Sequence, residues 1–223
     1  ANQKLETKLL LSTIGIDLLF LFFFLVAAFS IITSRYHKLL YQSMQSSSSL
    51  VSYEFTNRLE DLVTMTNIVR SDSTVQSTLD EIYQPQEDYA VHYYSDIYSA
   101  LQKHYLEYRQ PYLKMAAISC PRFITYTNEN IACRPDADLT KELIALAEAG
   151  EGSPVWVTSH AEDLGIFLVR EIKKIKNLRL DNLGTLIINV NLGDLVTEMS
   201  KISNEYKDSY WIIYEKDQLL FSS

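Results

Sequence analysis

The 223-residue chain carries a net charge of −8, is 47% hydrophobic, and contains only 6 glycines, 5 prolines and two cysteines. This composition excludes a disordered chain and a disulfide-stapled scaffold. The acidic balance argues against nucleic acid as a partner, because contacts to phosphates need clustered Lys and Arg.

The first predicted element is the apolar segment Leu9–Thr33, whose only charged residue is Asp17. As a helix, its 25 residues are long enough to cross a bilayer core of roughly 30 Å. We interpret it as an uncleaved anchor, because the apolar region of a signal peptide is about 7 to 15 residues long and precedes a small-residue cleavage site. Asp17 is expected at the headgroups, with a functional intramembrane acid as the alternative. The flanking charges are balanced and do not orient the span.

Residues 34–70 contain no Gly or Pro, so we expect the membrane helix to continue to about Arg70. A narrow stripe of residues follows one face of this helix. It comprises Leu40, Met44, Ser47, Val51, Phe55, Leu59, Leu62, Thr66 and Val69. Packing against the helix's own domain is the favoured interpretation of the stripe, and self-association is the alternative.

Two shorter helices are predicted next. One begins at Asp72 or Ser73, both good N-caps, and stops at Pro85. The other runs from Glu87 to Tyr108 and ends before Pro111. The predicted buried face of this second helix is Ala90, Tyr94, Ile97, Leu101, Tyr105 and Tyr108.

From Pro111 onward, short apolar runs separated by turns predict a sheet. The expected strands are Leu113–Ser119, Phe123–Tyr126, Asn130–Cys133, Val155–Thr158, Gly165–Ile172 and Gly184–Asn191. A helix capped by Asp138 and closed by Gly150 separates the third and fourth strands, and Leu192–Asn204 is predicted as another helix. The last hairpin, residues 210–222, has no sheet to join in this sequence, so we expect the chain to be part of a longer protein.

The two cysteines, Cys120 and Cys133, fall in one predicted hairpin. An oxidising compartment would allow a disulfide between them. A turn at residues 128–130 would place them out of register, so pairing would need a bulge near Pro121. Two half-buried thiols are the favoured prediction, and the disulfide is the alternative.

No motif for catalysis or cofactor binding is present. The four histidines are scattered, and the sequence has neither a Gly-rich phosphate loop nor a Gly-x-Ser-x-Gly elbow. We therefore predict no catalytic residue, metal or cofactor. The candidates for ligand contact are Arg122, Tyr126, Trp156, His160 and Arg170. Arg170 interrupts an apolar strand, so it either holds an anionic or hydroxylated ligand or, as we favour, pairs structurally with Glu171 or a nearby Asp.

Four stretches, in this order, resemble a known family. They are RLEDLVTMTNIVRSDSTVQSTL (Arg58–Leu79), GSPVWVTS (Gly152–Ser159), IFLVREIKKIKNL (Ile166–Leu178) and LGTLIINVNLGDL (Leu183–Leu195). They resemble the extracytoplasmic double Cache sensor region of YesM-like sensor histidine kinases of Gram-positive bacteria. The fold class that the resemblance implies is α+β: a transmembrane helix continuing into a long helix, then a PAS-like antiparallel sheet with flanking helices and the start of a second, membrane-proximal sheet.

The resemblance also implies a domain plan and partners. The plan is a cytoplasmic N-terminus (1–8), a membrane helix (9–33), an extracytoplasmic helical stalk (34–110), a membrane-distal Cache lobe (111–205) and the start of a membrane-proximal lobe (206–223). A small-molecule ligand or a ligand-loaded binding protein would alter the distal sheet of a homodimer and shift the first helix. A second span, a HAMP linker and a kinase would follow residue 223. The amino-acid-binding signature of some double Cache receptors is absent, so an amino-acid ligand is not supported.

Three alternatives to the kinase remain at this stage. The same domain could belong to a chemoreceptor or to a cyclic-dinucleotide enzyme, because function would then reside in later modules. A membrane-anchored binding protein without signalling is the third alternative, and the unfinished last hairpin speaks against it.

Overall fold

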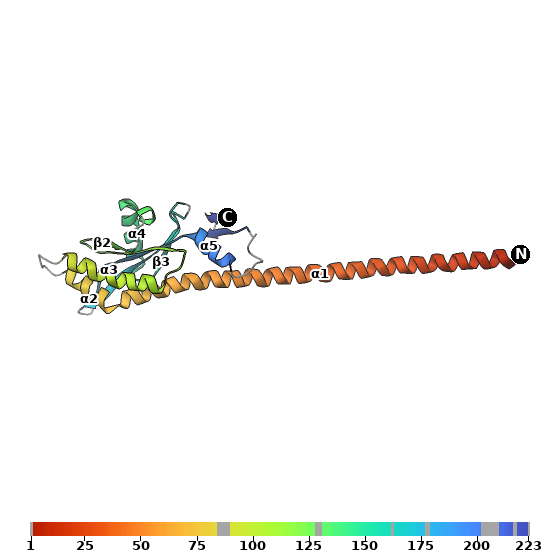
Figure 1. Ribbon diagram of the computed structural model, residues 1–223, viewed down its shortest axis with the longest axis horizontal. Coiled ribbons are helices and arrows are strands. Elements are labelled where there is room, and N and C mark those ends of the chain that lie inside the picture. Colours follow the sequence, from red (N-terminus) through yellow and green to blue (C-terminus); the bar gives the residue numbers. More distant parts are fainter. Residues whose placement is uncertain are drawn as a thin grey trace. The chain divides into compact units, whose positions relative to one another are not determined.

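A computed structural model of the protein describes residues 2–83, 90–127, 131–161, 163–176, 179–201, 210–215 and 218–222. The chain forms two compact units, Ala1–Tyr53 and Glu54–Ser223. Both the long N-terminal helix and the mixed α+β architecture expected from the sequence are present (Figure 1). The predicted turn at 128–130 lies outside the described residues.

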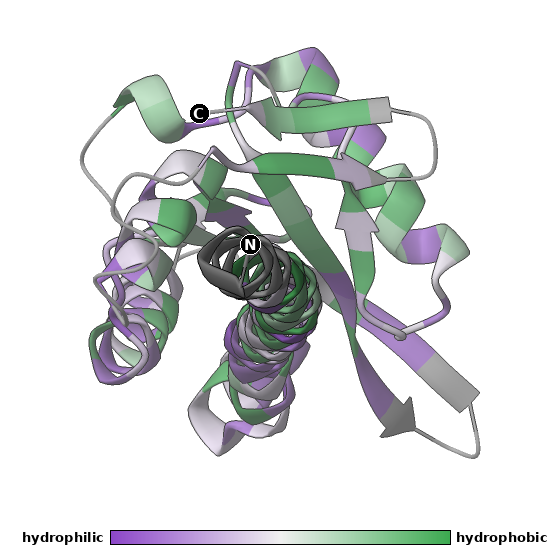
Figure 2. Ribbon diagram, turned by 90° about the vertical axis from the view of Figure 1, so that its right-hand side faces the viewer, coloured by the Kyte–Doolittle hydropathy of each residue, from purple (hydrophilic) through white to green (hydrophobic). Residues whose placement is uncertain are grey.

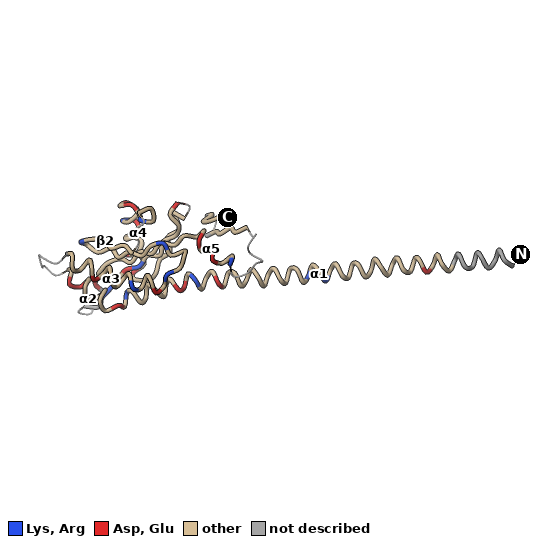
Figure 3. Tube along the Cα trace, in the orientation of Figure 1, with Lys and Arg blue, Asp and Glu red and all other residues tan. Residues whose placement is uncertain are grey.

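The first unit is helical throughout its described part and belongs to α1, Asn2–Ser71. Uninterrupted helix is expected here because residues 34–70 contain no Gly or Pro. The large apolar side chains from Ile14 to Leu50 are exposed, and Figure 2 shows hydrophobic colouring on the helix next to its grey N-terminal end. Figure 3 shows few charged residues along it. By length and composition, α1 could cross a membrane, and no residue of its most apolar 18-residue segment is buried.

The second unit contains a five-stranded antiparallel sheet with the strand order β2-β1-β5-β4-β3. The strands are β1 (Leu113–Ser119), β2 (Ile124–Tyr126), β3 (Val155–Val157), β4 (Ile166–Lys176) and β5 (Arg179–Val190). The long central strands β4 and β5 are rich in Ile, Val and Leu, which fit a sheet covered on both faces. Strand β3 is short, so β4 beyond Val169 has no strand partner on that side among the described residues.

Helices cover the two faces of the sheet (Figure 1). Helix α4, Ala137–Ala149, packs its Leu143 and Ala147 against Phe167 and Val169 of β4. The end of α1 meets the opposite face, and α2 (Ser73–Ile82) and α3 (Ala90–Glu107) lie beside each other below the sheet in Figure 1. Because successive strand residues point to opposite faces, each strand contributes side chains both to the α4 side of the sheet and to the side that meets α1.

Aspartates cap the N-termini of α2 and α4, and one of these two caps differs from the prediction. Asp72 caps α2, accepting from the backbone N–H groups of Thr74 and Val75 at 2.8 and 3.1 Å. Helix α4 is capped by Asp136 rather than by the predicted Asp138. The Asp136 carboxylate accepts from two N–H groups of the first turn, whereas Asp138 already lies inside that turn.

Two further predictions were wrong. Ile131–Cys133 forms a short 3₁₀ helix, η1, instead of a strand, so the cysteines do not share a hairpin. Both thiols are free and half-buried. On α3, Ile97 and Leu101 are buried as predicted, but Tyr93 is buried in place of Tyr94, which is 41% exposed and meets the Phe123 ring edge to face. A single residue of helical phase, about 100°, separates these two positions.

The C-terminal part of the chain contains α5 (Leu192–Ser200), capped by Asn191, and a separate antiparallel pair, β6 (Ile212–Glu215) and β7 (Gln218–Ser222). The predicted last hairpin is therefore confirmed as a two-stranded sheet. The predicted end of the preceding helix at Asn204 lies outside the described residues.

Candidate ligand-binding site

The five residues expected to contact a ligand do not form one cluster. Strand alternation places Arg170 and Trp156 on the sheet face that meets α1, and Tyr126 on the face that packs against α4. Arg122 is exposed after β1, and His160 lies in the turn after β3. No single site can therefore use all five.

Arg170 is a structural connector. Its side chain is 7% exposed and donates to Gly152 O from Nε at 2.8 Å. Its Nη1 donates to Thr66 Oγ1 at 3.1 Å and to Asn67 Oδ1 at 2.6 Å, so β4, α1 and the loop after α4 are joined by one guanidinium. Burial lowers the pKa of Arg170, and the nearby Arg70 lowers it further. The favoured structural role agrees with this geometry, but the partners are neutral groups rather than Glu171 or an Asp.

The predicted residues on the α4 side have local partners. The Arg134 guanidinium lies 4.6 Å from the centroid of the Tyr126 ring. Burial raises the pKa of the Tyr126 hydroxyl, and Arg134 opposes this rise. His160 Nε2 lies 3.6 Å from Glu142 Oε2 on α4. These contacts hold η1, α4 and the turn after β3 around the sheet.

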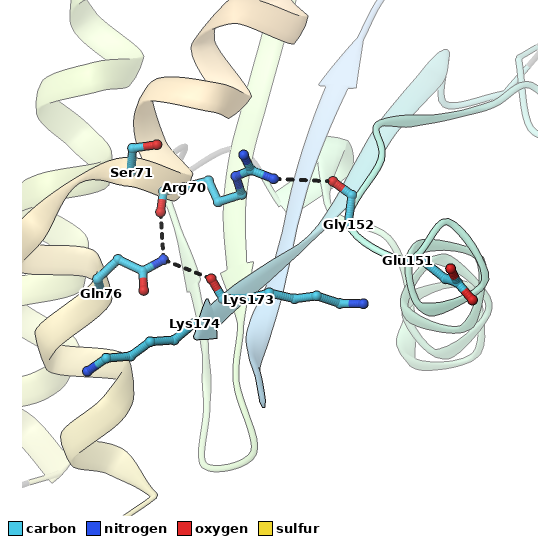
Figure 4. A pocket seen from close by; sticks show the side chains of 7 residues that line it. All are labelled: Arg70, Ser71, Gln76, Glu151, Gly152, Lys173 and Lys174. Carbon is cyan, nitrogen blue, oxygen red and sulfur yellow. Dashed lines mark hydrogen bonds between the residues drawn. The ribbon is translucent and has the colours of Figure 1, made fainter. Parts of the chain in front are cut away.

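A pocket of about 450 Å³ lies where the end of α1 meets α2, the loop after α4 and the free edge of β4 (Figure 4). A volume of this order suits a small molecule. The lining residues are Arg70, Ser71, Gln76, Glu151, Gly152, Lys173 and Lys174. None of these was among the ligand-contact candidates named from the sequence. The available signal was the basic pair Lys173–Lys174 in the second half of β4.

Backbone carbonyls around this pocket are tied by side chains. Gln76 Nε2 donates to Arg70 O at 2.6 Å and, more weakly, to Lys173 O at 3.5 Å. The Gln76 amide thus connects the last turn of α1 with the unpaired edge of β4. Arg70 Nη1 approaches Gly152 O at 3.5 Å, so this one carbonyl faces two guanidinium groups, those of Arg70 and Arg170. Figure 4 shows the Arg70 side chain extending from α1 toward Gly152.

The loop on the far side of the pocket has an unusual backbone. Glu151 has φ 51° and Gly152 has φ 90°, both in the left-handed region that non-glycine residues seldom adopt. This turn directs the Gly152 carbonyl toward the two arginines. A left-handed non-glycine residue at such a position is stored strain, which is common at ligand sites.

The two lysines of the pocket extend in opposite directions in Figure 4. Lys174 Nζ lies 2.8 Å from Asp80 Oδ2 of α2. Lys173 Nζ forms an ion pair with the buried Glu171 Oε2 at 2.8 Å. Each lysine is therefore partly neutralised by a neighbouring carboxylate.

A smaller pocket of about 200 Å³ lies at the same end of the sheet, against α4. Its polar groups come from Ser119, Asn182, Glu148 and Thr185. It is too small for most metabolites and carries little positive charge. Within the part of the chain that the structure describes, no group of three or more His, Cys, Asp or Glu side chains is arranged to hold a metal ion.

No protein-family model and no curated protein matches this chain. Among solved structures, the chain is similar to the ligand-binding domain of the Campylobacter jejuni chemoreceptor Tlp3 in complex with L-valine. The TM-score is 0.47 and the sequence identity is 14%, over 82% of this chain and 72% of that chain.

Proposed function

We propose that this chain is the extracytoplasmic sensing region of a membrane-anchored signalling protein. The observation that carries the proposal is the composition of α1. One helix contains an exposed apolar stretch long enough to cross a bilayer and, in its last turns, the buried residues Leu62, Met65 and Val69. The final residues of the same helix, Arg70 and Ser71, line the larger pocket. A ligand in that pocket would therefore contact the helix that enters the membrane.

The finer assignment is the sensor region of a YesM-like histidine kinase, working as a homodimer. Its support is the sequence resemblance over Arg58–Leu79, Gly152–Ser159, Ile166–Leu178 and Leu183–Leu195. A ligand that binds one arrangement of the domain more tightly would shift the population toward it, and α1 would pass the change on. A chemoreceptor would use the same region with a different output module.

The location is tested by cysteine labelling in cells that express the chain. Cys120 and Cys133 are first replaced by serine, and a single new cysteine is then introduced by Ser153→Cys in an exposed loop or by Lys4→Cys before the apolar segment. A membrane-impermeant maleimide should label the Ser153→Cys protein in intact cells and the Lys4→Cys protein only after permeabilisation. The reverse pattern would overturn the proposed orientation, and labelling of neither before lysis would overturn the anchored extracytoplasmic location.

A further inference from the structure

The larger pocket concentrates positive charge on an acidic protein. The whole chain has a net charge of −8, yet three cations and one carboxylate line this pocket. The cations are Arg70, Lys173 and Lys174, and the carboxylate is that of Glu151. Lys173 and Lys174 also meet the carboxylates of Glu171 and Asp80, so the uncompensated positive charge of the lining lies at Arg70, and it favours an anionic occupant.

The two guanidiniums give the strongest argument. Arg170 is nearly fully buried and donates to Gly152 O of the pocket lining; its other acceptors among the described residues are the neutral oxygens of Thr66 and Asn67. Arg70 approaches the same Gly152 carbonyl from the pocket side. Among the described residues, neither guanidinium is paired with a carboxylate. A buried cation with neutral partners alone is costly, and the second cation beside it adds repulsion. An anion in the pocket would offset both.

The neutral groups of the pocket are compatible with anionic oxygens. Gln76 donates its amide protons to Arg70 O and Lys173 O, so two carbonyls that would repel an anion are already engaged. Ser71 adds an exposed hydroxyl next to Arg70. A guanidinium presents paired N–H groups that match carboxylate or phosphate oxygens in bidentate geometry. The volume, about 450 Å³, exceeds what a lone inorganic ion needs.

We propose that the pocket formed by Arg70, Ser71, Gln76, Gly152 and Lys173 binds a small metabolite that carries carboxylate or phosphate groups. This inference rests on the proposed sensing function for its biological role, and it names the chemical class of the sensed ligand. Arg70 would supply the bidentate contact, and Lys173 would exchange part of its interaction with Glu171 for the ligand. Because Arg70 and Ser71 end α1, the ligand would contact that helix directly.

The test is a calorimetric titration of the purified full chain in detergent micelles, with the ionic strength held constant by NaCl. Citrate and glucose 6-phosphate are the carboxylate and phosphate probes, and glycerol and glucose are their neutral counterparts. We expect at least one anionic probe to bind and both neutral compounds to fail. The stronger of the two anions identifies the preferred group.

Charge variants separate binding at this pocket from general anion effects. Arg70→Gln and Lys173→Gln should each weaken binding at least tenfold, while Glu151→Gln should tighten it several-fold because it removes a like charge. Lys141→Gln, on the exposed surface of α4, is the matched control and should leave binding unchanged. Circular dichroism and the thermal midpoint confirm that each variant is folded. Anions that are excluded from the protein surface also stabilise folded proteins, but this general effect acts on all variants alike and so differs from binding at this pocket.

Two results would overturn the proposal: no binding of either anion to the wild-type chain, or equal binding by wild type, Arg70→Gln and Glu151→Gln. The outcome is independent of the labelling experiment. A chain that binds citrate but proves to be cytoplasmic would contradict the sensing function and leave the anion site standing. An extracytoplasmic chain that binds neither probe would contradict the anion site and leave the proposed location standing.

Discussion

At the scale of single residues, Asp72 joins two helices, α2 and α3, with one carboxylate. Its Oδ1 caps α2 through two backbone N–H groups, and its Oδ2 lies 2.9 Å from Nε2 of the buried His104 on α3. Burial is the largest influence on the pKa of Asp72 and raises it, but the hydrogen bonds from His104, Val75 and Thr74 together outweigh burial and lower it. The ionised carboxylate is therefore the form that the fold stabilises.

This geometry predicts a pH-dependent stability contribution. A lowered pKa in the folded state means that the contribution is fully present above the ordinary aspartate pKa, near 4, and is lost as the pH falls through the lower folded value. Asp72→Ala should cost about 1 to 3 kcal/mol at neutral pH, since both the cap and the His104 contact disappear. Chemical denaturation of the full chain in micelles at pH 6 and at pH 3 measures it.

The gap in unfolding free energy between wild type and Asp72→Ala should narrow at the lower pH. Asp138→Ala is the control, because that carboxylate is exposed in the first turn of α4 and pairs with the exposed Lys141. Its effect should stay below about 1 kcal/mol, as is usual for surface pairs. A gap for Asp72→Ala that is the same at both pH values would contradict the linkage.

Arg170 shows what sequence reasoning can and cannot supply for a site. A charged residue inside an apolar strand signals a buried, partnered cation, and this was predicted. Its partners are Thr66 and Asn67, more than 100 positions earlier, and a loop carbonyl at Gly152. None of these three neutral oxygens carries a local sequence signal that would connect it with Arg170. The pocket was not predicted for the same reason, because its lining comes from four separate segments of the chain that only the tertiary fold brings together.

At the scale of elements, the sheet was largely predictable and short segments were not. Apolar runs bounded by turns located all five strands, because burial on both faces leaves a continuous apolar signal, but the more polar residues 173–176 of β4 and 179–183 of β5 were not predicted as strand. The segment Ile131–Cys133 is too short for periodicity to separate a strand from a 3₁₀ turn. On α3, Ile97 and Leu101 were assigned correctly to the buried face, but the buried tyrosine is Tyr93 and not Tyr94, because the two side chains are chemically identical and only packing selects between them.

The start of β4 depends on a glycine with no room for a side chain. Gly165 has φ 90°, and a Cβ there would lie 2.3 Å from Val190 O. Gly165→Ala should therefore destabilise the fold by about 2 to 4 kcal/mol, through backbone strain and a steric clash. Gly152 shares φ 90°, but its nearest neighbour for a Cβ is the flexible Lys173 side chain at 3.6 Å.

Gly152→Ala is thus the matched control for strain without a clash, and it should cost about 1 to 2 kcal/mol. The difference between the two variants in chemical denaturation reports the clash alone. Equal losses would show that the strand shifts to make room, contrary to the tight register that joins β4 to β5.

At the scale of the whole molecule, the proposed signalling route runs through α1. Residues 34–70 contain no Gly or Pro to break the helix. The four serines Ser46–Ser49 have low helix propensity and weaken it locally. Two glycines inserted after Ser47 should lower helix stability by about 1 kcal/mol each and uncouple ligand from output. Autophosphorylation of the proposed full-length kinase, with and without citrate or glucose 6-phosphate, measures the response.

Ligand affinity should stay within about twofold of wild type in the insertion variant, because the insertion after Ser47 lies several helical turns before the pocket residues Arg70 and Ser71. The pair Ser48→Ala and Ser49→Ala strengthens the same stretch and serves as the control, which should keep its ligand response. A Gly–Gly variant that responds as wild type does would rule out transmission along α1.

The corner between α1 and α2 consists of one residue. Helix α1 ends at Ser71, α2 begins at Ser73, and Asp72 between them is fixed by its own cap and by His104. Such a joint has no slack. A displacement of α2 toward a ligand at Gln76 has to be absorbed by the two backbone torsions of Asp72 or be passed to the end of α1 as a pull or a twist. Because this connection is only one residue long, little of such a displacement can be lost in it, and movement of α2 is coupled directly to α1.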